Sequence, residues 1–312
     1  MPTSTLRADL ARDGFVVVRQ LLTSEELETY RAAAKRTTDR ARSGNWPNVR
    51  TVGKQFPPWV KPTPGNPPAK GIWGVQGLMN PDLGTDADVF ARSYFNEKVL
   101  GVAKELLSRD DEECTDDDLV LELYNMLVRP ESDFDLEWHR DDIPRTASAE
   151  LEAERLGIES LKAGQAKRYW STQWNLALYP DESLIVIPGS HTRLRTDIER
   201  NAAPREPTLP NQLSVKLEPG DIAFYDNNIL HRGSYDSTKE RMSLHGTVGH
   251  RRGASQRARN VLQHGLGAWV DRCDFSVLEK DGDGIKARAE GMRERLLKLA
   301  RESGNVGYSQ EG

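Results

Sequence analysis

The chain has 312 residues, and 43 Lys and Arg against 48 Asp and Glu give it a formal net charge of −5. With 37% hydrophobic and 29% charged residues, its composition is typical of a globular protein and excludes disorder, collagen and coiled coil. The chain lacks the basic footprint of nucleic-acid-binding proteins. It also lacks the roughly 18 consecutive apolar residues of a membrane span. We therefore expect no nucleic-acid and no membrane partner.

The two ends and the cysteines bear on location. The N-terminal residues lack the apolar core of a signal peptide, and the last residues, SQEG, match neither SKL nor KDEL. Cys114 and Cys273 are far apart and belong to no CxxC pair, so we expect reduced thiols in a cytoplasmic protein. A homo-oligomer is compatible with the sequence, but no motif indicates one.

The N-terminal third begins with a strand and a helix. Residues 14–19 (GFVVVR) form a β-branched run, and Thr23 with Glu26 fits a capping box for the helix that follows. Residues 44–84 are rich in Pro, Gly and Trp. Because disordered segments are poor in aromatic residues, we expect this long loop to be an ordered cover over a site.

The rest of the chain alternates short strand candidates with turns. Residues 89–108 have helical spacing, 119–129 are strand-like, and 145–167 read as a polar helical insertion. Further strand candidates are 170–179, 183–188, 213–217, 222–225 and 242–248, and a helix closes the chain at 285–303. This pattern predicts a mainly β fold with a helical surround, an antiparallel sandwich or jelly roll.

We expect one domain over residues 1–312. It comprises a strand–helix region to about 110, a jelly-roll core over 115–250 that contains the insertion, and a C-terminal loop and helix over 251–312.

One short cluster carries metal-ligand chemistry. On a strand, residues i and i+2 share a face, so His139 and Asp141 point the same way. One imidazole and one carboxylate are two thirds of the facial triad that binds Fe(II) and leaves the opposite positions open. An HxD alone is a weak signal. His231, which follows the strand at 221–225, is suitably placed to be the third ligand.

A basic residue follows at a fixed spacing. Arg241 stands ten residues after His231, and Ser243 lies two residues further on the same strand face. A guanidinium can hold a carboxylate through two parallel hydrogen bonds. The pair could therefore bind the far carboxylate of a dicarboxylate cosubstrate.

Taken together, these motifs resemble the phytanoyl-CoA dioxygenase family, over roughly residues 10–250. The motifs are the HxD at 139–141, PGSH at 188–191, PGD at 219–221 and the His231–Arg241 spacing, in the family's order. The resemblance implies a double-stranded β-helix (jelly-roll, cupin-like) core and a non-haem dioxygenase that uses Fe(II), 2-oxoglutarate and O2. It departs from the family near residues 74–76, where some members place a basic residue on the cosubstrate and this chain has none.

The resemblance also implies residue roles. Iron would be held by His139, Asp141 and His231, and the C5 carboxylate of 2-oxoglutarate by Arg241 and Ser243. Met126 and Trp174 would line the cosubstrate pocket. The family's reaction is oxidation of a C–H bond, by default hydroxylation, while 2-oxoglutarate loses CO2 and becomes succinate. Desaturation, epoxidation and rearrangement would use the same residues.

The substrate class is less defined. A small-molecule metabolite or natural product of secondary metabolism is our expectation. Substrate contacts are expected from the polar and aromatic residues Trp73, Gln76, Tyr124, Gln173 and Asn175. We expect His264, in a polar loop, to be exposed.

Two other classes stay open. A non-catalytic jelly-roll binding or regulatory protein would have no need of the complete set of His139, Asp141, His231 and Arg241. A zinc-type hydrolase could use the same three ligands, although Arg241 favours a bound dicarboxylate.

Overall fold

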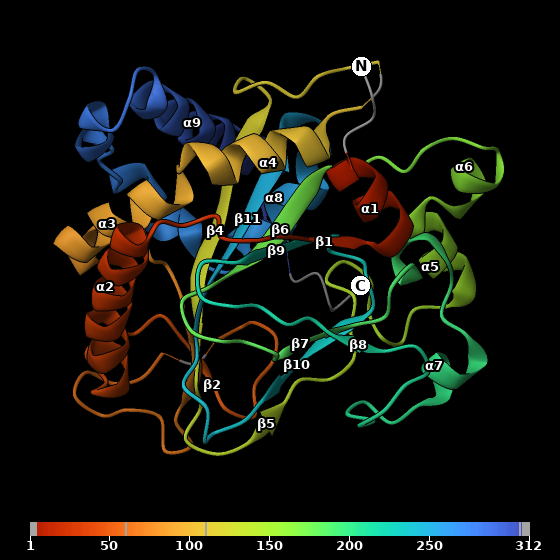
Figure 1. The fold of residues 1–312 in the computed structure, drawn as a ribbon, viewed down its shortest axis with the longest axis horizontal. Coiled ribbons are helices and arrows are strands. Elements are labelled where there is room, and N and C mark those ends of the chain that lie inside the picture. The colour runs from red at the N-terminus through yellow and green to blue at the C-terminus, as the bar shows by residue number, and fades with distance from the viewer. Residues whose placement is uncertain (1–4, 60, 110, 306, 308–312) are drawn as a thin grey trace.

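A computed structural model describes residues 5–59, 61–109, 111–305 and 307. Two antiparallel sheets face each other and form the predicted jelly roll (Figure 1). The large sheet has the order β1 (Phe15–Val18), β9 (Ile222–Tyr225), β6 (Ser171–Ala177), β11 (Met242–His250), β4 (Leu119–Val128), β3 (Ile72–Val75) and β2 (Val49–Thr51). The small sheet has the order β5 (Phe134–Asp135), β10 (His231–Tyr235), β7 (Leu184–Val186) and β8 (Leu213–Ser214).

Helices surround the two sheets. The longer ones are α1 (Thr5–Asp13), α2 (Ser24–Arg42), α3 (Thr85–Tyr94), α4 (Glu97–Leu107), α8 (Ala254–Leu262) and α9 (Ile285–Ser303). The predicted insertion contains α5 (Ala149–Leu156) and α6 (Ile158–Lys162), and α7 (Asp197–Asn201) follows the PGSH turn. Short 3-10 turns are η1 (Pro81–Leu83), η2 (Ser190–Thr192), η3 (Arg251–Gly253), η4 (Leu266–Ala268), η5 (Val270–Arg272) and η6 (Ser276–Lys280). No helix in the described ranges is long and apolar enough to cross a bilayer.

Local sequence explains where α2 begins. The Thr23 hydroxyl accepts a hydrogen bond from the Glu26 N–H at 3.2 Å, and the Glu26 carboxylate accepts one from the Thr23 N–H at 2.7 Å. This is the predicted capping box, which satisfies two of the helix's unpaired N–H groups.

The segment 44–84 contains two strands that its composition did not predict. β3 pairs with β4 through Gly74 and Val75, and β2 pairs with β3, so both extend the edge of the large sheet. Strand pairing with a distant segment is a tertiary effect, which Pro- and Gly-rich local sequence does not indicate.

Side-chain alternation gives the large sheet two distinct faces. Trp174 on β6 packs on the helix-covered face, with its ring centroid 5.5 Å from Tyr94 of α3 and 5.8 Å from Phe224 of β9. Gly246 of the neighbouring strand makes room for this indole, because a Cβ there would lie 2.1 Å from the ring. The odd-numbered residues of β6 and β11 therefore face the small sheet, and the candidate site lies between the sheets.

Candidate metal centre

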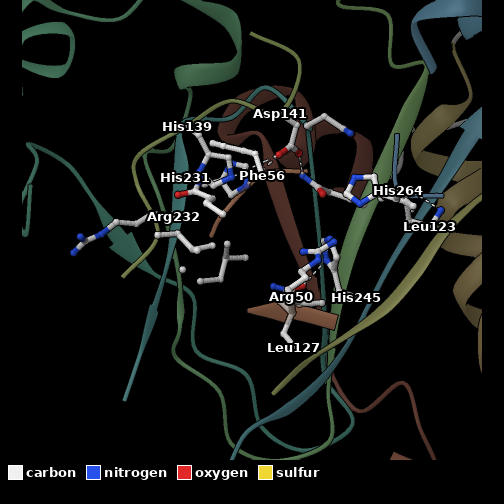
Figure 2. Close-up of a pocket in the computed structure, with 18 of the residues that line it drawn as sticks. Arg50, Phe56, Leu123, Leu127, His139, Asp141, His231, Arg232, His245 and His264 are labelled. Atoms are coloured by element: carbon white, nitrogen blue, oxygen red, sulfur yellow. Dashed lines mark hydrogen bonds and ion pairs between the residues drawn. The ribbon is translucent and has the colours of Figure 1, made fainter. Parts of the chain in front are cut away.

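The structure brings His139, Asp141 and His231 together at one end of the small sheet (Figure 2). The Nε2 atoms of His139 and His231 lie 3.6 and 3.9 Å from Oδ1 of Asp141. One donor atom from each residue lies within 4.8 Å of the other two. His231 is the first residue of β10, and the other two follow β5.

Backbone hydrogen bonds fix the spacing of the three residues. The His139 N–H donates to the His231 carbonyl at 3.0 Å, and the His231 N–H donates back to the His139 carbonyl at 3.1 Å. The Asp141 N–H donates to the Asn227 carbonyl at 2.9 Å. The polypeptide itself therefore holds the donor atoms near one another.

Hydrogen bonds to the second ring nitrogen orient both imidazoles. Nδ1 of His139 lies 2.7 Å from the Glu137 carbonyl, and Nδ1 of His231 lies 2.8 Å from the Ile229 carbonyl. A carbonyl only accepts, so an Nδ1 that donates to it carries the proton and leaves the lone pair on Nε2. At His139 the Gln55 Nε2, a donor, lies 3.0 Å from the same Nδ1 and donates to the Glu137 carbonyl at 3.2 Å. Burial lowers the pKa of each histidine to about 4. Both rings are therefore neutral donors near neutral pH.

The carboxylate of Asp141 is oriented by an amide. Gln173 on β6 donates from Nε2 to Oδ2 of Asp141 at 2.6 Å, and Oδ1 lies toward the two imidazoles. Burial raises the pKa of Asp141, while His139 and the Gln173 hydrogen bond act in the opposite direction. Gln173, expected as a substrate contact, thus contacts a candidate ligand. Two neutral imidazoles and one oriented carboxylate fit a divalent transition metal.

The residue between the two HxD ligands, Arg140, is 1% exposed and anchors the cluster. Its Nε donates to the Glu152 carboxylate of α5 at 3.0 Å. Its two terminal nitrogens donate to the carbonyls of Ser190 at 3.0 Å, Arg193 at 3.1 Å and Asn228. Arg140 therefore ties the HxD segment to the insertion, the PGSH turn and the loop before β10.

A cavity of about 120 Å³ lies beside these ligands, between the sheets, and we call it the inter-sheet cavity. Its floor is made by inward-facing residues of β4, β6 and β11, namely Leu123, Leu127, Gln173, Asn175, His245 and Thr247. The segment 44–84 adds Gln55, Phe56, Pro57, Trp59 and Trp73. The ring centroid of Phe56 lies 5.4 Å from that of His139, so this segment contributes to the wall at the candidate ligands.

Arg241, the expected cosubstrate anchor, lines the inter-sheet cavity but has a partner within the chain. Its Nε donates to Oδ2 of Asp181 at 2.9 Å, and the Ser243 hydroxyl donates to the same oxygen. Burial opposes the charge on Arg241, yet the attraction of Asp181 raises its pKa overall. Nη1 of Arg241 is buried with no hydrogen-bond partner in the described ranges. Sequence reasoning missed Asp181.

Three expected pocket residues lie elsewhere, which corrects the sequence prediction. Trp174, Met126 and Tyr124 are 0–2% exposed and pack in the core on the other face of the large sheet. Strand alternation is the reason, since Trp174 stands between Gln173 and Asn175 and must point away from them. This could have been read from the sequence.

Gln76, expected as a substrate contact, is not among the described residues that line the inter-sheet cavity and lies beside His264 instead. Nε2 of the Gln76 amide lies 3.2 Å from Nδ1 of His264, and His264 lines the inter-sheet cavity. The expectation that His264 is exposed is therefore wrong, because its loop folds inward. Trp73 and Asn175, expected as substrate contacts, do line the cavity.

Arg50 on β2 is a cavity residue that sequence reasoning did not single out. In the strand register it lies directly opposite Gly74 of β3. Arg50 therefore lies beside residues 74–76, which contain no basic side chain of their own. A Cβ at Gly74 would lie 3.1 Å from Cδ of Arg50, so the absence of a side chain at Gly74 leaves room for the arginine.

A second cluster, Cys114, Asp118 and His250, has the composition of a metal site but not its hydrogen bonding. Nδ1 of His250 accepts the N–H of Arg252 at 3.2 Å, so the ring proton sits on Nε2, the nitrogen nearer Asp118. Asp118 is also engaged by Arg251 at 2.8 Å. We therefore treat this cluster as structural.

Comparison with known proteins bears on the fold. No family model matches the chain, and no curated protein sequence matches it. The resemblance to the phytanoyl-CoA dioxygenase family therefore depends on the motifs alone. Among solved structures, AviO1 from Streptomyces viridochromogenes Tue57 is similar with a TM-score of 0.52 and 16% identity, covering 79% of this chain and 94% of that one.

Two other solved structures are similar to the same degree. EctD from S. alaskensis, a structure with bound Fe, has a TM-score of 0.52 and 17% identity over 80% of this chain and 78% of its own. HygX from Streptomyces hygroscopicus, with nickel and 2-oxoglutarate bound, has a TM-score of 0.52 and 16% identity over 80% and 87%. At these identities the likeness establishes a shared double-stranded β-helix fold.

Proposed function

We propose that this protein is a non-haem Fe(II)- and 2-oxoglutarate-dependent dioxygenase that oxidises a C–H bond of a small molecule. The observation that carries the proposal is the set of two neutral imidazoles and one oriented carboxylate beside a cavity between two sheets. That donor set, on one face of a metal, suits Fe(II) with open positions. The same fold holds iron in EctD, and nickel with 2-oxoglutarate in HygX, which supports the choice.

Different residues of the chain would hold the metal and the cosubstrate. Nε2 of His139, Nε2 of His231 and Oδ1 of Asp141 would hold the metal. Iron with 2-oxoglutarate and O2 supplies the oxidant for the C–H bond, with succinate and CO2 as coproducts. Arg241 would give its unpartnered Nη1 to the far carboxylate of 2-oxoglutarate, and Asp181 keeps the guanidinium in place through Nε.

The inter-sheet cavity sets what can be oxidised. Aromatic side chains of 55–59 and Trp73 line it, and a cavity of about 120 Å³ favours a compact organic substrate over a polymer. We propose hydroxylation of a small metabolite or natural product as the reaction.

The test begins without oxygen. Adding Fe(II) and then 2-oxoglutarate anaerobically to the metal-free protein is expected to produce a visible metal-to-ligand charge-transfer band. A zinc-type hydrolase and a non-catalytic binding protein would produce none. On admission of O2, succinate formation is expected, measured by chromatography.

The matched variants are Asp141→Ala and Glu137→Ala. The first removes a ligand and is expected to abolish both the band and succinate formation. The second removes a carboxylate that pairs with Arg205 at 3.3 Å and leaves intact the Glu137 carbonyl that orients His139. Full succinate formation by Asp141→Ala would rule out the proposed metal centre.

A further inference from the structure

Among the described residues, Arg50 is a buried cation with no hydrogen-bond acceptor and no carboxylate partner. It is 8% exposed and lines the inter-sheet cavity. Its guanidinium forms no hydrogen bond or ion pair with any residue in the described ranges, and its Nε is fully buried. Burying a charge without a partner costs several kcal/mol. A protein retains such a group where a ligand completes it.

The other buried arginines of the described chain differ from Arg50. Four of them, Arg140, Arg195, Arg241 and Arg257, form ion pairs with buried carboxylates. Arg232 also lines the inter-sheet cavity, pairs with no carboxylate in the described ranges and leaves Nε and Nη1 without a hydrogen-bond partner there, but its Nη2 donates to the Pro207 carbonyl at 2.9 Å. Its guanidinium also points away from the candidate metal ligands (Figure 2).

The residues around Arg50 hold its side chain in place without accepting hydrogen bonds from it. Its guanidinium carbon lies 5.6 Å from the ring centroid of Trp59 and 5.2 Å from that of Trp73. Gly74 lies under the side-chain stem, where a Cβ would lie 3.1 Å from Cδ of Arg50 and 3.3 Å from its Cβ. Aromatic faces stabilise a cation without using its N–H groups, so the terminal nitrogens of Arg50, unlike its buried Nε, keep their donors for a ligand.

Electrostatics agree with this geometry. Burial is the largest influence on the pKa of Arg50 and lowers it, and attraction from Tyr235 and Asp141 offsets burial only in part. In Figure 2 Arg50 lies below the candidate ligands, on the same wall as His245. An anion bound between Arg50 and the metal centre would offset the cost of burying the Arg50 charge.

We propose that Arg50 binds a carboxylate, or an equivalent anionic oxygen group, of a molecule that enters the inter-sheet cavity. The inference rests on the proposed function in treating this cavity as the substrate site. The anion has two possible sources, the far carboxylate of 2-oxoglutarate, shared with Arg241, or an anionic group of the oxidised substrate. In either case this residue selects for negatively charged ligands.

The test measures anion binding by calorimetry on the metal-free full chain at low ionic strength. The probes are glutarate, which keeps both carboxylates of 2-oxoglutarate but lacks the keto group, and benzoate, a monoanion. Hydrogen bonds to a charged group are worth about 1.5–3 kcal/mol, so Arg50→Gln is expected to weaken the affected probe about 10- to 100-fold. Arg50→Lys is expected to lose less, because the charge remains.

The pattern of loss identifies the source. Weaker glutarate binding with benzoate unchanged assigns Arg50 to the cosubstrate. Weaker benzoate binding with glutarate unchanged assigns it to the substrate. The proposal is overturned if Arg50→Gln binds both probes as the wild type does, or if the wild type binds neither at millimolar concentration.

Two controls separate this proposal from folding defects and from the proposed function. Arg205→Gln removes an arginine that pairs with Glu137 at 3.3 Å and does not line the inter-sheet cavity, and it is expected to leave both affinities unchanged. Should Arg50→Gln fail to fold, Arg50→Met removes the same charge and keeps an unbranched side chain beside the two indoles, and unchanged binding in that variant overturns the proposal. Mn(II) binding, followed by electron paramagnetic resonance, is measured separately. Its absence in the wild type would contradict the metal centre and leave the anion result standing.

Discussion

At the scale of single residues, the Gln173 amide is the contact that sets the angle of the Asp141 carboxylate. Groups that orient a metal ligand typically contribute a factor of about 10 to 100 in metal affinity. We predict that Gln173→Leu weakens Mn(II) binding by about this factor, measured by titration with electron paramagnetic resonance. Asn175→Leu is the matched control, because Asn175 faces the same cavity but bonds to His245. Equal losses in the two variants would contradict the orienting role.

Gly246 is a second residue at which a single added carbon atom is expected to change the stability of the fold. A Cβ at Gly246 would lie 2.1 Å from the Trp174 indole, which is 0% exposed and cannot move aside. Overpacking of this kind costs about 1–3 kcal/mol, so Gly246→Ala is expected to lower the free energy of unfolding by that amount in urea denaturation. Gly101 in α4 has open space around it, and Gly101→Ala is expected to stabilise by about 0.5–1 kcal/mol.

The sequence could predict the roles of some site residues and not of others. The difference is whether the role depends on neighbours in the sequence or on contacts between distant segments. The HxD spacing is local, and His139 and Asp141 do lie together. The expectation that they share one face of a strand is wrong, because His139 forms only an isolated bridge with His231 and Asp141 lies in a bend. Arg50 could not be predicted, since its position depends on β2 pairing with β3 across a Pro-rich segment. The role of Asp181 likewise depends on its tertiary contact with Arg241, which the sequence does not indicate. Trp174 was predictable in principle, because alternation on one strand already separates it from its neighbours.

At the scale of elements, the insertion helix α5 supports the candidate metal centre through one carboxylate. Glu152 is 0% exposed and pairs with Arg140 and Arg195, at 3.0 and 2.9 Å, and with Arg200. Burial by itself would raise the pKa of Glu152, but attraction from these arginines lowers it below 4.5 overall. Its stabilisation is therefore complete above the unfolded-state pKa and is lost as pH falls through the lower, folded-state pKa.

The lowered pKa of Glu152 predicts how the stability of Glu152→Gln depends on pH. Breaking a buried ion pair costs about 3–5 kcal/mol, so the variant is expected to be less stable than the wild type by that amount at pH 7. The gap is expected to close as pH falls through the folded-state pKa of Glu152, which lies below 4.5, because the wild-type carboxyl is then protonated as well. Thermal unfolding followed by circular dichroism between pH 7 and 3 measures both. Glu154→Gln, on the exposed face of α5, is the control, and a gap independent of pH would contradict the assignment.

Elements with strong local signals were predicted well. The capping box of α2 and the helices of the insertion appear where their sequence indicates them. The strands β2 and β3 were missed, because an edge strand of three or four residues is stabilised by its neighbour and leaves little periodic pattern of its own.

At the scale of the whole molecule, folding and metal binding are expected to be separate events. The reciprocal backbone hydrogen bonds between His139 and His231, and the Arg140 contacts, hold the site without help from a metal. In proteins whose metal site forms only on binding, a chelator causes unfolding. Here we predict that EDTA removes the metal and its associated activity while leaving far-UV circular dichroism unchanged. Cooperative unfolding on chelation would contradict a preformed site.

The two indoles beside Arg50 have a practical consequence. Trp59 and Trp73 lie 6.0 Å apart, centroid to centroid, with the guanidinium near both rings. Neutralising a charge this close changes the electric field across each indole and so shifts its emission. The protein thus carries an optical reporter at the place where an anion would bind. A library of metabolites can be screened by tryptophan fluorescence before any product has been identified.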